Sequence, residues 1–305
     1  MHARSLSKLV VGCLAIAVAG LASCGSGNDA APQAQAGREG WPEVIRFGLI
    51  PSEGGTDIVE TFMPLLAHIE DELGIRVEPK PASEYAGVIT AMANDQVEAA
   101  YFGPKSYTEA AIIADAQAIV RELSADGEPG YYGIIIVNAQ SEYQTLEDLR
   151  GVAFGFVSPN STSGWLVPSV GVLMATGEAP DQFFGDISYT GTHGTAIAQV
   201  AQGRLPAAAT NTLDLNTMAR KGEVDESMIR EVWRSDLIPA APIAVRRELP
   251  ESFKTALRDA VLSFNNNRAE LMRMGRGGFV EATDADFDPV RLLEDKRSEL
   301  AAEAE

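Results

Sequence analysis

The sequence of 305 residues predicts an α/β fold made of two units, the second inserted into the first. Segments of strand length and helix length alternate along the chain, which is typical of sheets covered by helices. The alternation restarts after a strongly apolar run at 133–138, and the segment after 238 again has the character of the first unit. We therefore expect largely parallel sheets and a cleft between the two units, where ligands often bind.

The first unit is expected to begin with a strand at 44–50, because apolar residues alternate there and the run ends at Pro51. Apolar residues at helical spacing predict the next helix at 58–73, with Gly74 at its C-terminal end. The same two patterns predict further strands and helices: strands at 76–79, 99–103 and 133–138, and helices at 85–94 and 107–118.

The second unit repeats the alternation and then leads back to the first. Its strands are expected at 152–157, 187–189 and 207–210, and its helices at 161–176 and 194–202, after a short helical turn at 146–149. A strand-like run at 228–239 is followed by a strand at 244–246 and a helix at 251–265. We expect one lobe at 44–137 plus 238–305 and the other at 138–237. Lys105 and the charged C-terminal helix at 294–305 are interpreted as solvated.

Three hydroxyl residues, Ser161, Thr162 and Ser163, lie between a predicted strand and a predicted helix. The first backbone N–H groups of a helix have no intrahelical partner and carry partial positive charge. Ser and Thr at this point either cap the helix or, together with those N–H groups, bind an anion. The local sequence leaves both interpretations open.

The charge and the cysteines exclude some classes of protein. A net charge of −19 argues against a nucleic-acid partner, because binding to phosphate backbones needs clustered Lys and Arg. A small anionic ligand is still compatible, since it responds to local donors rather than to net charge. Both cysteines, Cys13 and Cys24, lie close to the N-terminus, so the body is expected to fold without a disulfide.

The N-terminal residues resemble a bacterial lipoprotein leader. A short basic segment precedes an apolar run at 9–21, and the residues that lead to Cys24 resemble a lipobox. We expect a signal peptide at 1–23, acylation of Cys24 and a flexible tether at 24–43, which is rich in Gly, Ala and Gln. The folded body would then be lipid-anchored in the cell envelope, in the periplasm or on the outer face of the cell membrane.

The sequence argues against an enzyme. Its three histidines, His2, His68 and His193, form no cluster with metal-ligand spacing. The chain has neither a G-x-S-x-G elbow nor a Walker-type phosphate loop. We therefore expect no catalytic residue, no metal and no cofactor, and a phosphorus-ester hydrolase is the alternative from another class.

Six short stretches, taken in order, resemble the phosphate/phosphite/phosphonate substrate-binding proteins of bacterial ABC importers. The resemblance covers about 44–285, nearly the whole body. The stretches are Tyr85-Ala86-Gly87-Val88-Ile89, Ala125-Asp126-Gly127-Glu128-Pro129-Gly130-Tyr131, Pro159-Asn160-Ser161-Thr162-Ser163-Gly164, Thr192-His193, Thr210-Asn211-Thr212 and Leu237-Ile238-Pro239. The resemblance implies a two-lobed periplasmic-binding-protein fold of the type II kind, with the ligand in the cleft between the lobes.

The resemblance also implies a set of residues that bind the oxyanion: Tyr85, Tyr131, Ser161, Thr162, Ser163 and His193. The hydroxyl run would donate hydroxyl and N–H hydrogen bonds to the phosphorus oxygens. His193 would donate a ring N–H and, if protonated, offset part of the anionic charge. Tyr85 would reach across from the first lobe, and Tyr131 would line the cleft near the hinge.

Two positions depart from relatives that take aminoalkylphosphonates. Those relatives hold the ligand's ammonium group with carboxylates where this chain has Leu213 and Ala241, although Asp214 lies next to Leu213. An ammonium buried without an ionic partner is costly. The expected ligand is therefore a small phosphorus oxyanion without an amine, with phosphite and methylphosphonate favoured and phosphate or 2-aminoethylphosphonate as alternatives.

The resemblance implies a monomer that delivers its ligand to a membrane permease and its ATPase. Its lobes would close on the ligand about a hinge near 137–138 and 237–239. The alternative partner is a membrane sensor, to which the protein would present the ligand as a receptor.

Overall fold

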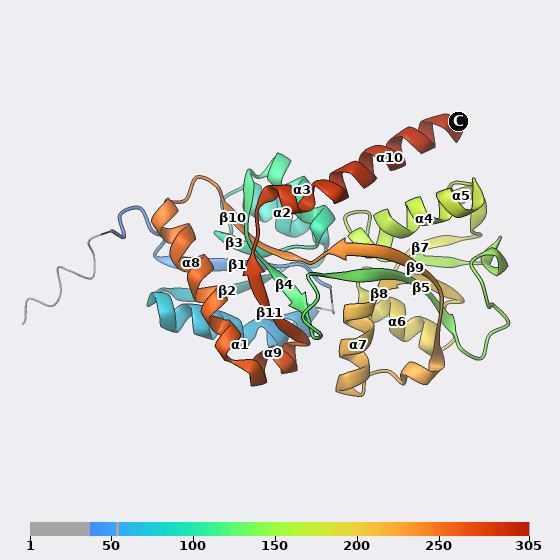
Figure 1. Cartoon of the computed structure of the whole chain (residues 1–305), viewed down its shortest axis with the longest axis horizontal. Coiled ribbons are helices and arrows are strands. Elements are labelled where there is room, and N and C mark those ends of the chain that lie inside the picture. Colours follow the sequence, from blue (N-terminus) through green and yellow to red (C-terminus); the bar gives the residue numbers. More distant parts are fainter. Residues whose placement is uncertain (1–36, 53–54, 305) are drawn as a thin grey trace, which may run out of the picture. The chain divides into compact units, whose positions relative to one another are not determined.

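The structure is a computed structural model that describes residues 37–52 and 55–304. The predicted signal peptide, Cys24 and most of the predicted tether lie outside the described residues. From Arg38 onward the chain forms one compact unit. Two separate sheets organise it, each with its own helices (Figure 1). The body is thus two-lobed, as the sequence predicts.

Six strands form the sheet of the first lobe, in the order β11–β4–β10–β3–β1–β2. Strand β1 pairs in parallel with β2 and β3, whereas β10 pairs antiparallel with β3 and β4, and β11 pairs antiparallel with β4. The bounds are β1 Val44–Leu49, β2 Arg76–Pro81, β3 Ala99–Tyr101, β4 Ala116–Ser124, β10 Pro242–Arg246 and β11 Arg276–Glu281.

Helices cover this sheet and complete the first lobe's core. The spacing that predicts the first helix is confirmed, because Ile58, Phe62, Leu65, Leu66 and Ile69 are all buried on one face of α1. The helices of the lobe are α1 Gly55–Leu73, α2 Tyr85–Ala93, α3 Pro104–Ile113, α8 Glu251–Ser263, α9 Arg268–Met274 and α10 Asp288–Ala304.

Five strands form the sheet of the second lobe, in the order β7–β6–β8–β5–β9. The short strand β6 pairs in parallel with both β7 and β8. The long strand β5 pairs antiparallel with β8 on one side and with the long strand β9 on the other. The elements are β5 Gly130–Asn138, β6 Phe154–Phe156, a π-turn Thr162–Leu166, α4 Val167–Thr176, α5 Pro180–Phe183, β7 Ile187–Tyr189, α6 His193–Ala201, β8 Ala207–Asn211, α7 Thr212–Lys221 and β9 Ile229–Pro239. Short 3₁₀ turns at Glu147–Leu149, Glu226–Met228, Phe264–Asn266 and Asp284–Phe287 complete the described elements of the chain.

Both sheets are mixed, so the prediction of largely parallel sheets is wrong in part. The chain passes between the sheets twice, at 125–129 between β4 and β5 and at 240–241 between β9 and β10. The strands next to these crossings, β4, β5, β9 and β10, pair antiparallel, whereas the parallel pairs are joined through helices. The predicted crossing at 137–138 lies inside the second sheet, because β5 pairs with β8 and β9 along its length.

One predicted helix is in fact a helix followed by a strand. Helix α3 ends at Ile113, Asp115 has a left-handed φ of 46°, and β4 begins at Ala116. A non-glycine residue with positive φ interrupts regular structure. The run of alanine and isoleucine around it fits both periodicities, so the pattern does not show the change. Helices α7 and α9 and strand β11 were also not predicted.

The C-terminal helix begins earlier than predicted, at Asp288, and its first turn is packed, whereas no residue of 294–300 is buried. Val290 of α10 is buried and packs against Leu166 and Val170 of the second lobe, beside α4 (Figure 1). Lys105, interpreted from the sequence as a solvated residue, is also buried. Its ammonium forms ion pairs with Glu109 and with Glu294 of α10. The two lobes therefore touch along α3, α4 and α10.

Helix α4 packs closely against β9 at Gly171, so a larger residue at this position should destabilise the second lobe. A methyl group added there would lie 2.1 Å from the Trp233 ring atom Cζ2. We expect Gly171→Ala to lower the free energy of unfolding by about 1–3 kcal/mol, because the substitution overpacks the second lobe. Met174→Ala, on the same helix and 61% exposed, is the control that should change little. Denaturant titration measures both, and equal stability of the two variants would contradict this packing.

Candidate functional site

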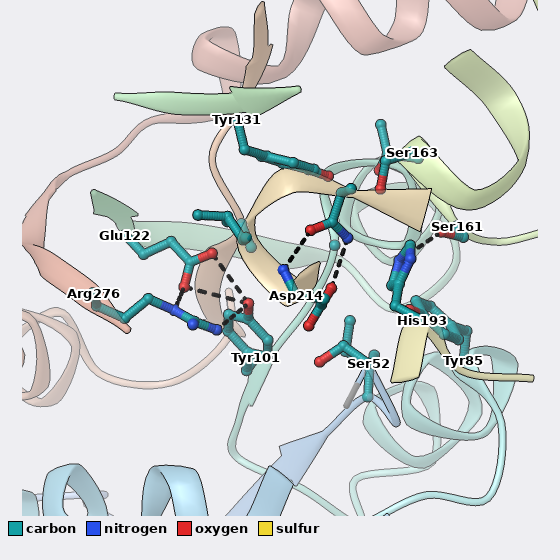
Figure 2. Close-up of a pocket in the computed structure, with 16 residues that line it drawn as sticks. Ser52, Tyr85, Tyr101, Glu122, Tyr131, Ser161, Ser163, His193, Asp214 and Arg276 are labelled. Atoms are coloured by element: carbon teal, nitrogen blue, oxygen red, sulfur yellow. Dashed lines mark hydrogen bonds and ion pairs between the residues drawn. The ribbon is translucent and has the colours of Figure 1, made fainter. Parts of the chain in front are cut away.

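A small cavity of about 30 Å³ lies between the two lobes. Figure 2 shows the side chains that surround it. All six residues that the sequence assigns to the oxyanion site line this cavity: Tyr85, Tyr131, Ser161, Thr162, Ser163 and His193. They come from both lobes and from segments up to about a hundred residues apart, so the fold brings together what the sequence separates.

The hydroxyl run is both a helix cap and a wall of the cavity. Ser161 is the N-cap residue, and its Oγ accepts the Gly164 N–H at 3.0 Å. The backbone then makes a π-turn, in which the Leu166 N–H donates to the Ser161 carbonyl at 3.1 Å. Such turns often occur at functional sites. The two interpretations left open by the sequence are therefore compatible, because Thr162 and Ser163 face the cavity while Ser161 also caps the helix.

Glycine at position 164 allows this turn to fold. A Cβ atom there would lie 2.5 Å from the Val157 side chain and 2.8 Å from Ser161 Oγ. Any larger residue would push the start of the helix away from β6. The position of the three hydroxyls thus depends on this close approach.

Thr162 connects the cavity wall to the first lobe. Its Oγ1 accepts the backbone N–H of Lys105 at 2.8 Å, at the start of α3. Because the oxygen accepts this bond, the hydroxyl proton remains to be donated elsewhere. A second bond joins the lobes nearby, where the His193 N–H donates to the Ser52 carbonyl at 3.0 Å. Both bonds border the cavity.

His193 is neutral in this structure. Burial lowers the pKa of its ring to about 3. Nδ1 lies 3.1 Å from Thr210 Oγ1, and Nε2 lies 3.5 Å from Ser161 Oγ. When the Thr210 hydroxyl donates to Nδ1, the proton of the ring is on Nε2, beside the hydroxyl run. The ring is then a neutral donor. The sequence-based expectation that a protonated His193 offsets anionic charge is not met, because the ring is uncharged at neutral pH.

The tyrosines are also neutral donors. Tyr85 and Tyr131 are buried, and burial raises the pKa of each phenol well above its usual value. The Asp214 carboxylate raises both further. Each phenol therefore keeps its proton at any physiological pH and offers an O–H to the cavity.

A buried ion pair forms one wall of the cavity and was not predicted. The Arg276 Nε donates to Glu122, and the Arg276 Nη1 donates to the Met274 carbonyl at 2.8 Å. The hydroxyl of Tyr101 donates to the same carboxylate at 3.2 and 3.3 Å. Figure 2 shows this cluster on the opposite side of the cavity from Ser161 and His193. The positive charge of Arg276 is thus matched locally by Glu122.

Carboxylates do line the cavity, contrary to the premise drawn from Leu213 and Ala241. Both of those residues line it, as expected, but so do Glu122 and Asp214. Asp214 is only 8% exposed. The next residue after Leu213 therefore supplies the carboxylate whose absence the sequence suggested.

Ser52 is a further cavity residue that the sequence did not reveal. It follows β1, is 7% exposed and lines the cavity from the first lobe. Among the described residues, its Oγ has no hydrogen-bond partner. A buried hydroxyl without a partner is unfavourable unless a ligand or water satisfies it. Only this geometry identifies Ser52, since a serine after a strand has no distinctive pattern.

The described part of the chain shows neither a metal-binding cluster nor a membrane-spanning helix. Within 37–52 and 55–304, no three His, Cys, Asp or Glu side chains are grouped so as to hold a metal ion. No helix in these same ranges is long and apolar enough to cross a membrane.

The buried neutral ring of His193 makes the stability of the ligand-free protein depend on pH. The ring in the unfolded chain protonates near the ordinary histidine pKa of 6.5, whereas the pKa of the folded ring is about 3. Stability is therefore lost as the pH falls below 6.5, by about 1.4 kcal/mol per pH unit at most. We expect His193→Gln to lose less stability than the unchanged protein between pH 6.5 and 5, as measured by urea titration. Parallel pH profiles would contradict a buried neutral His193.

Comparison with known proteins identifies the family. A family model of the periplasmic substrate-binding proteins of ABC phosphonate transporters matches residues 47–287. The chain is 31% identical over 258 residues to the phosphonates-binding periplasmic protein of Escherichia coli K12, covering 82% of this chain and 76% of that one. It is 33% identical over 315 residues to the phosphate-import protein PhnD of Mycolicibacterium smegmatis, covering 95% and 96%.

A solved structure agrees with both the sequence relatives and the fold. The binding-protein component of an ABC phosphonate transporter from Pseudomonas aeruginosa superposes with a TM-score of 0.81 at 28% identity, covering 86% of this chain and 89% of that one. Members of this family are substrate-binding proteins rather than enzymes; they work outside the cytoplasm with a permease and an ATPase. The chain belongs to the phosphonate-binding family of ABC-transporter periplasmic substrate-binding proteins.

Proposed function

We propose that this protein captures a small phosphorus oxyanion without an amine, namely phosphite, methylphosphonate or phosphate, for import. The observation that carries the proposal is the ring of neutral donors around one cavity between the lobes. Hydrogen bonds to a charged acceptor are about twice as strong as those between neutral groups. Desolvated hydroxyl and N–H donors are therefore sufficient to bind an oxyanion.

The start of the second lobe's helix supplies the strongest part of this site. Thr162 and Ser163 lie at the first positions of the π-turn that leads into α4. Backbone N–H groups at a helix start favour bound anions. His193 lies at the start of α6, so a second helix begins at the same place. The oxyanion would bind where these two helices begin.

Two features of the cavity lining favour a ligand without an amine. Leu213 and Ala241 add apolar surface. Glu122, one of the two carboxylates, is already paired with Arg276. The relative from Mycolicibacterium smegmatis is named a phosphate-import protein, which adds phosphate to the candidate ligands.

Binding would draw the lobes together. Donors come from the first lobe, Tyr85 and Ser52, and from the second, Thr162 and His193. A ligand that contacts both lobes shifts an open–closed equilibrium toward the closed form. The two crossings, at 125–129 and 240–241, are the natural hinge. The bonds from Lys105 to Thr162 and from His193 to Ser52 would then form only in the closed protein.

We also propose that acylated Cys24 anchors the body to the membrane through the tether. The lipobox-like residues before Cys24 support this assignment. A flexible segment of the twelve residues at 25–36, between Cys24 and the described body, would give the tether a reach of roughly 17–21 Å. A monomer held in this way stays close to its permease.

A ligand panel tests the proposed function. We expect calorimetry to show that phosphite, methylphosphonate or phosphate binds more tightly than 2-aminoethylphosphonate and raises the melting temperature. Tighter binding of 2-aminoethylphosphonate than of the other three would contradict the amine-free ligand. Incubation with phosphorus esters, with and without metal ions, should release no product, whereas turnover would favour a hydrolase.

Removal of single donors tests the geometry of the site. We expect Ser52→Ala and Thr162→Ala each to weaken binding of the tightest ligand by about 1–3 kcal/mol, because each leaves a buried anionic oxygen without a partner. This corresponds to roughly 5- to 150-fold in Kd. Thr176→Ala removes a hydroxyl at the far end of α4 and should leave Kd unchanged. Unchanged Kd in Ser52→Ala would exclude this serine from the site.

A further inference from the structure

A cluster of charged side chains joins the two lobes just outside the cavity. Lys105 of α3 is only 6% exposed, and its ammonium forms an ion pair with Glu109, one turn later on the same helix. The Nδ2 of Asn160, a residue of the second lobe, donates to the other oxygen of Glu109 at 2.7 Å. Neither Glu109 nor Asn160 lines the cavity. The Glu109 carboxylate is therefore shared between a lysine of its own lobe and an amide of the facing lobe.

Trp165 and helix α10 extend this contact. Lys105 Nζ lies 5.4 Å from the centre of the Trp165 ring, and Arg297 Cζ of α10 lies 4.8 Å from it, both within the range of cation–π attraction. Arg297 donates to Glu294 at 2.9 and 3.1 Å, and Glu294 in turn lies 3.6 Å from Lys105 Nζ. The cluster thus combines two cations with two carboxylates and needs no further counter-charge.

The cluster is connected directly to a wall of the cavity. The backbone N–H of Lys105 donates to Thr162 Oγ1 at 2.8 Å, while the side chain of the same residue holds Glu109. Asn160 and Thr162 both belong to the segment that begins the second lobe's helix. A movement that separates α3 from this segment would therefore break the bond to Glu109 and the bond to Thr162 together.

We propose that Glu109 and Asn160 form a latch that holds the lobes closed over the ligand and so sets the rate at which the ligand leaves. This inference rests on the proposed function and adds two positioning residues that touch no ligand. A hydrogen bond to a charged group stabilises more than one between neutral groups. Because the latch joins the lobes only after they meet, its loss should speed opening and leave capture by the open form unchanged.

The folding of the separate lobes does not explain the bond between Asn160 and Glu109. The ion pair of Lys105 with Glu109 has i,i+4 spacing and supports α3 by itself. The start of the second lobe's helix is capped by the Ser161 side chain, so Asn160 is not needed as the cap. The bond across the lobes is thus left with the contact between them as its consequence.

The experiment exchanges the donor and the acceptor of this bond. Asn160→Asp places a second carboxylate against Glu109 and should raise the dissociation rate constant of the ligand by about 10-fold or more. The Asn160→Asp/Glu109→Gln double variant has the net charge of the unchanged protein and again pairs an amide with a carboxylate. Its dissociation rate constant should return to within about 3-fold of the unchanged value. Glu109→Gln alone completes the cycle and should also speed release, because Lys105 loses an ion-pair partner.

Rapid filtration on the full chain measures these rates with the radiolabelled form of whichever anion binds most tightly among phosphate, phosphite and methylphosphonate. The association rate constant should stay within about 3-fold of the unchanged value in every variant. Glu178→Gln is the matched control for Glu109→Gln, since Glu178 pairs with Arg150 inside the second lobe and far from the contact in sequence. Its release rate should equal that of the unchanged protein.

The outcomes separate the latch from the proposed function. An unchanged release rate in Asn160→Asp would overturn the latch. Fast release that the double variant does not correct would overturn it too, because position 160 would then act on the neighbouring hydroxyl run rather than through Glu109. If none of the three anions binds the unchanged protein, the proposed function itself fails.

Discussion

Neutral hydrogen-bond donors line the cavity between the lobes, and their burial where the lobes meet is the feature that organises this structure. The described side chains around the cavity include one arginine, Arg276, and it is bound to Glu122. In the proposed function, hydroxyls, a neutral imidazole and backbone N–H groups would therefore bind the ligand. Such donors are effective only where water is excluded. The two lobes meet around the cavity and provide this exclusion, and the bond between Lys105 and Thr162 shows how closely they meet.

Neutral donors would also give the proposed site its selectivity. A lysine or arginine with a free charge in the cavity would attract any small anion. Hydroxyl groups, in contrast, bind tightly only an anion whose oxygens match the directions of their hydrogen bonds. Ser161 illustrates how the fold fixes this arrangement, because one oxygen caps the helix through Gly164 and so positions the residues that follow. The approach of Gly164 to Val157 then holds the turn against β6. In the proposed site, affinity and specificity would thus come from the same packed turn.

The parts of the site that the sequence predicts have either a local signal or a match to the family. Ser161 to Ser163 stand between a predicted strand and a predicted helix, whereas His193 was assigned through the resemblance. Glu122 and Arg276 have no such signal, because they meet only through the pairing of β4 with β11, neither of which was predicted. Lys105 likewise looked solvated, since its partner Glu294 is far away in the sequence.

The fold, like the site, divides into features that local sequence predicts and features that depend on long-range pairing. The α1 helix and the strands β1 and β6 follow from periodicity, whereas the positions of the crossings depend on which sheet β5 joins, a long-range choice. Asp214 is the most instructive case. A comparison by position pointed to Leu213 and hence to a missing carboxylate, yet the adjacent residue on α7 lines the cavity. Successive side chains of a helix point about 100° apart, so a shift of one residue in an alignment changes which side chain is assigned to the cavity. The structure is needed to decide which residue of α7 supplies the carboxylate.

A crystal structure of the full body with bound phosphite would be the decisive experiment for the proposed site. We expect the anion between the lobes, with its oxygens within hydrogen-bonding distance of Thr162, Ser163, His193 and Tyr85, and with no lysine or arginine ammonium or guanidinium group in contact. An anion bound outside this cavity, or held mainly by Arg276 after separation from Glu122, would contradict it.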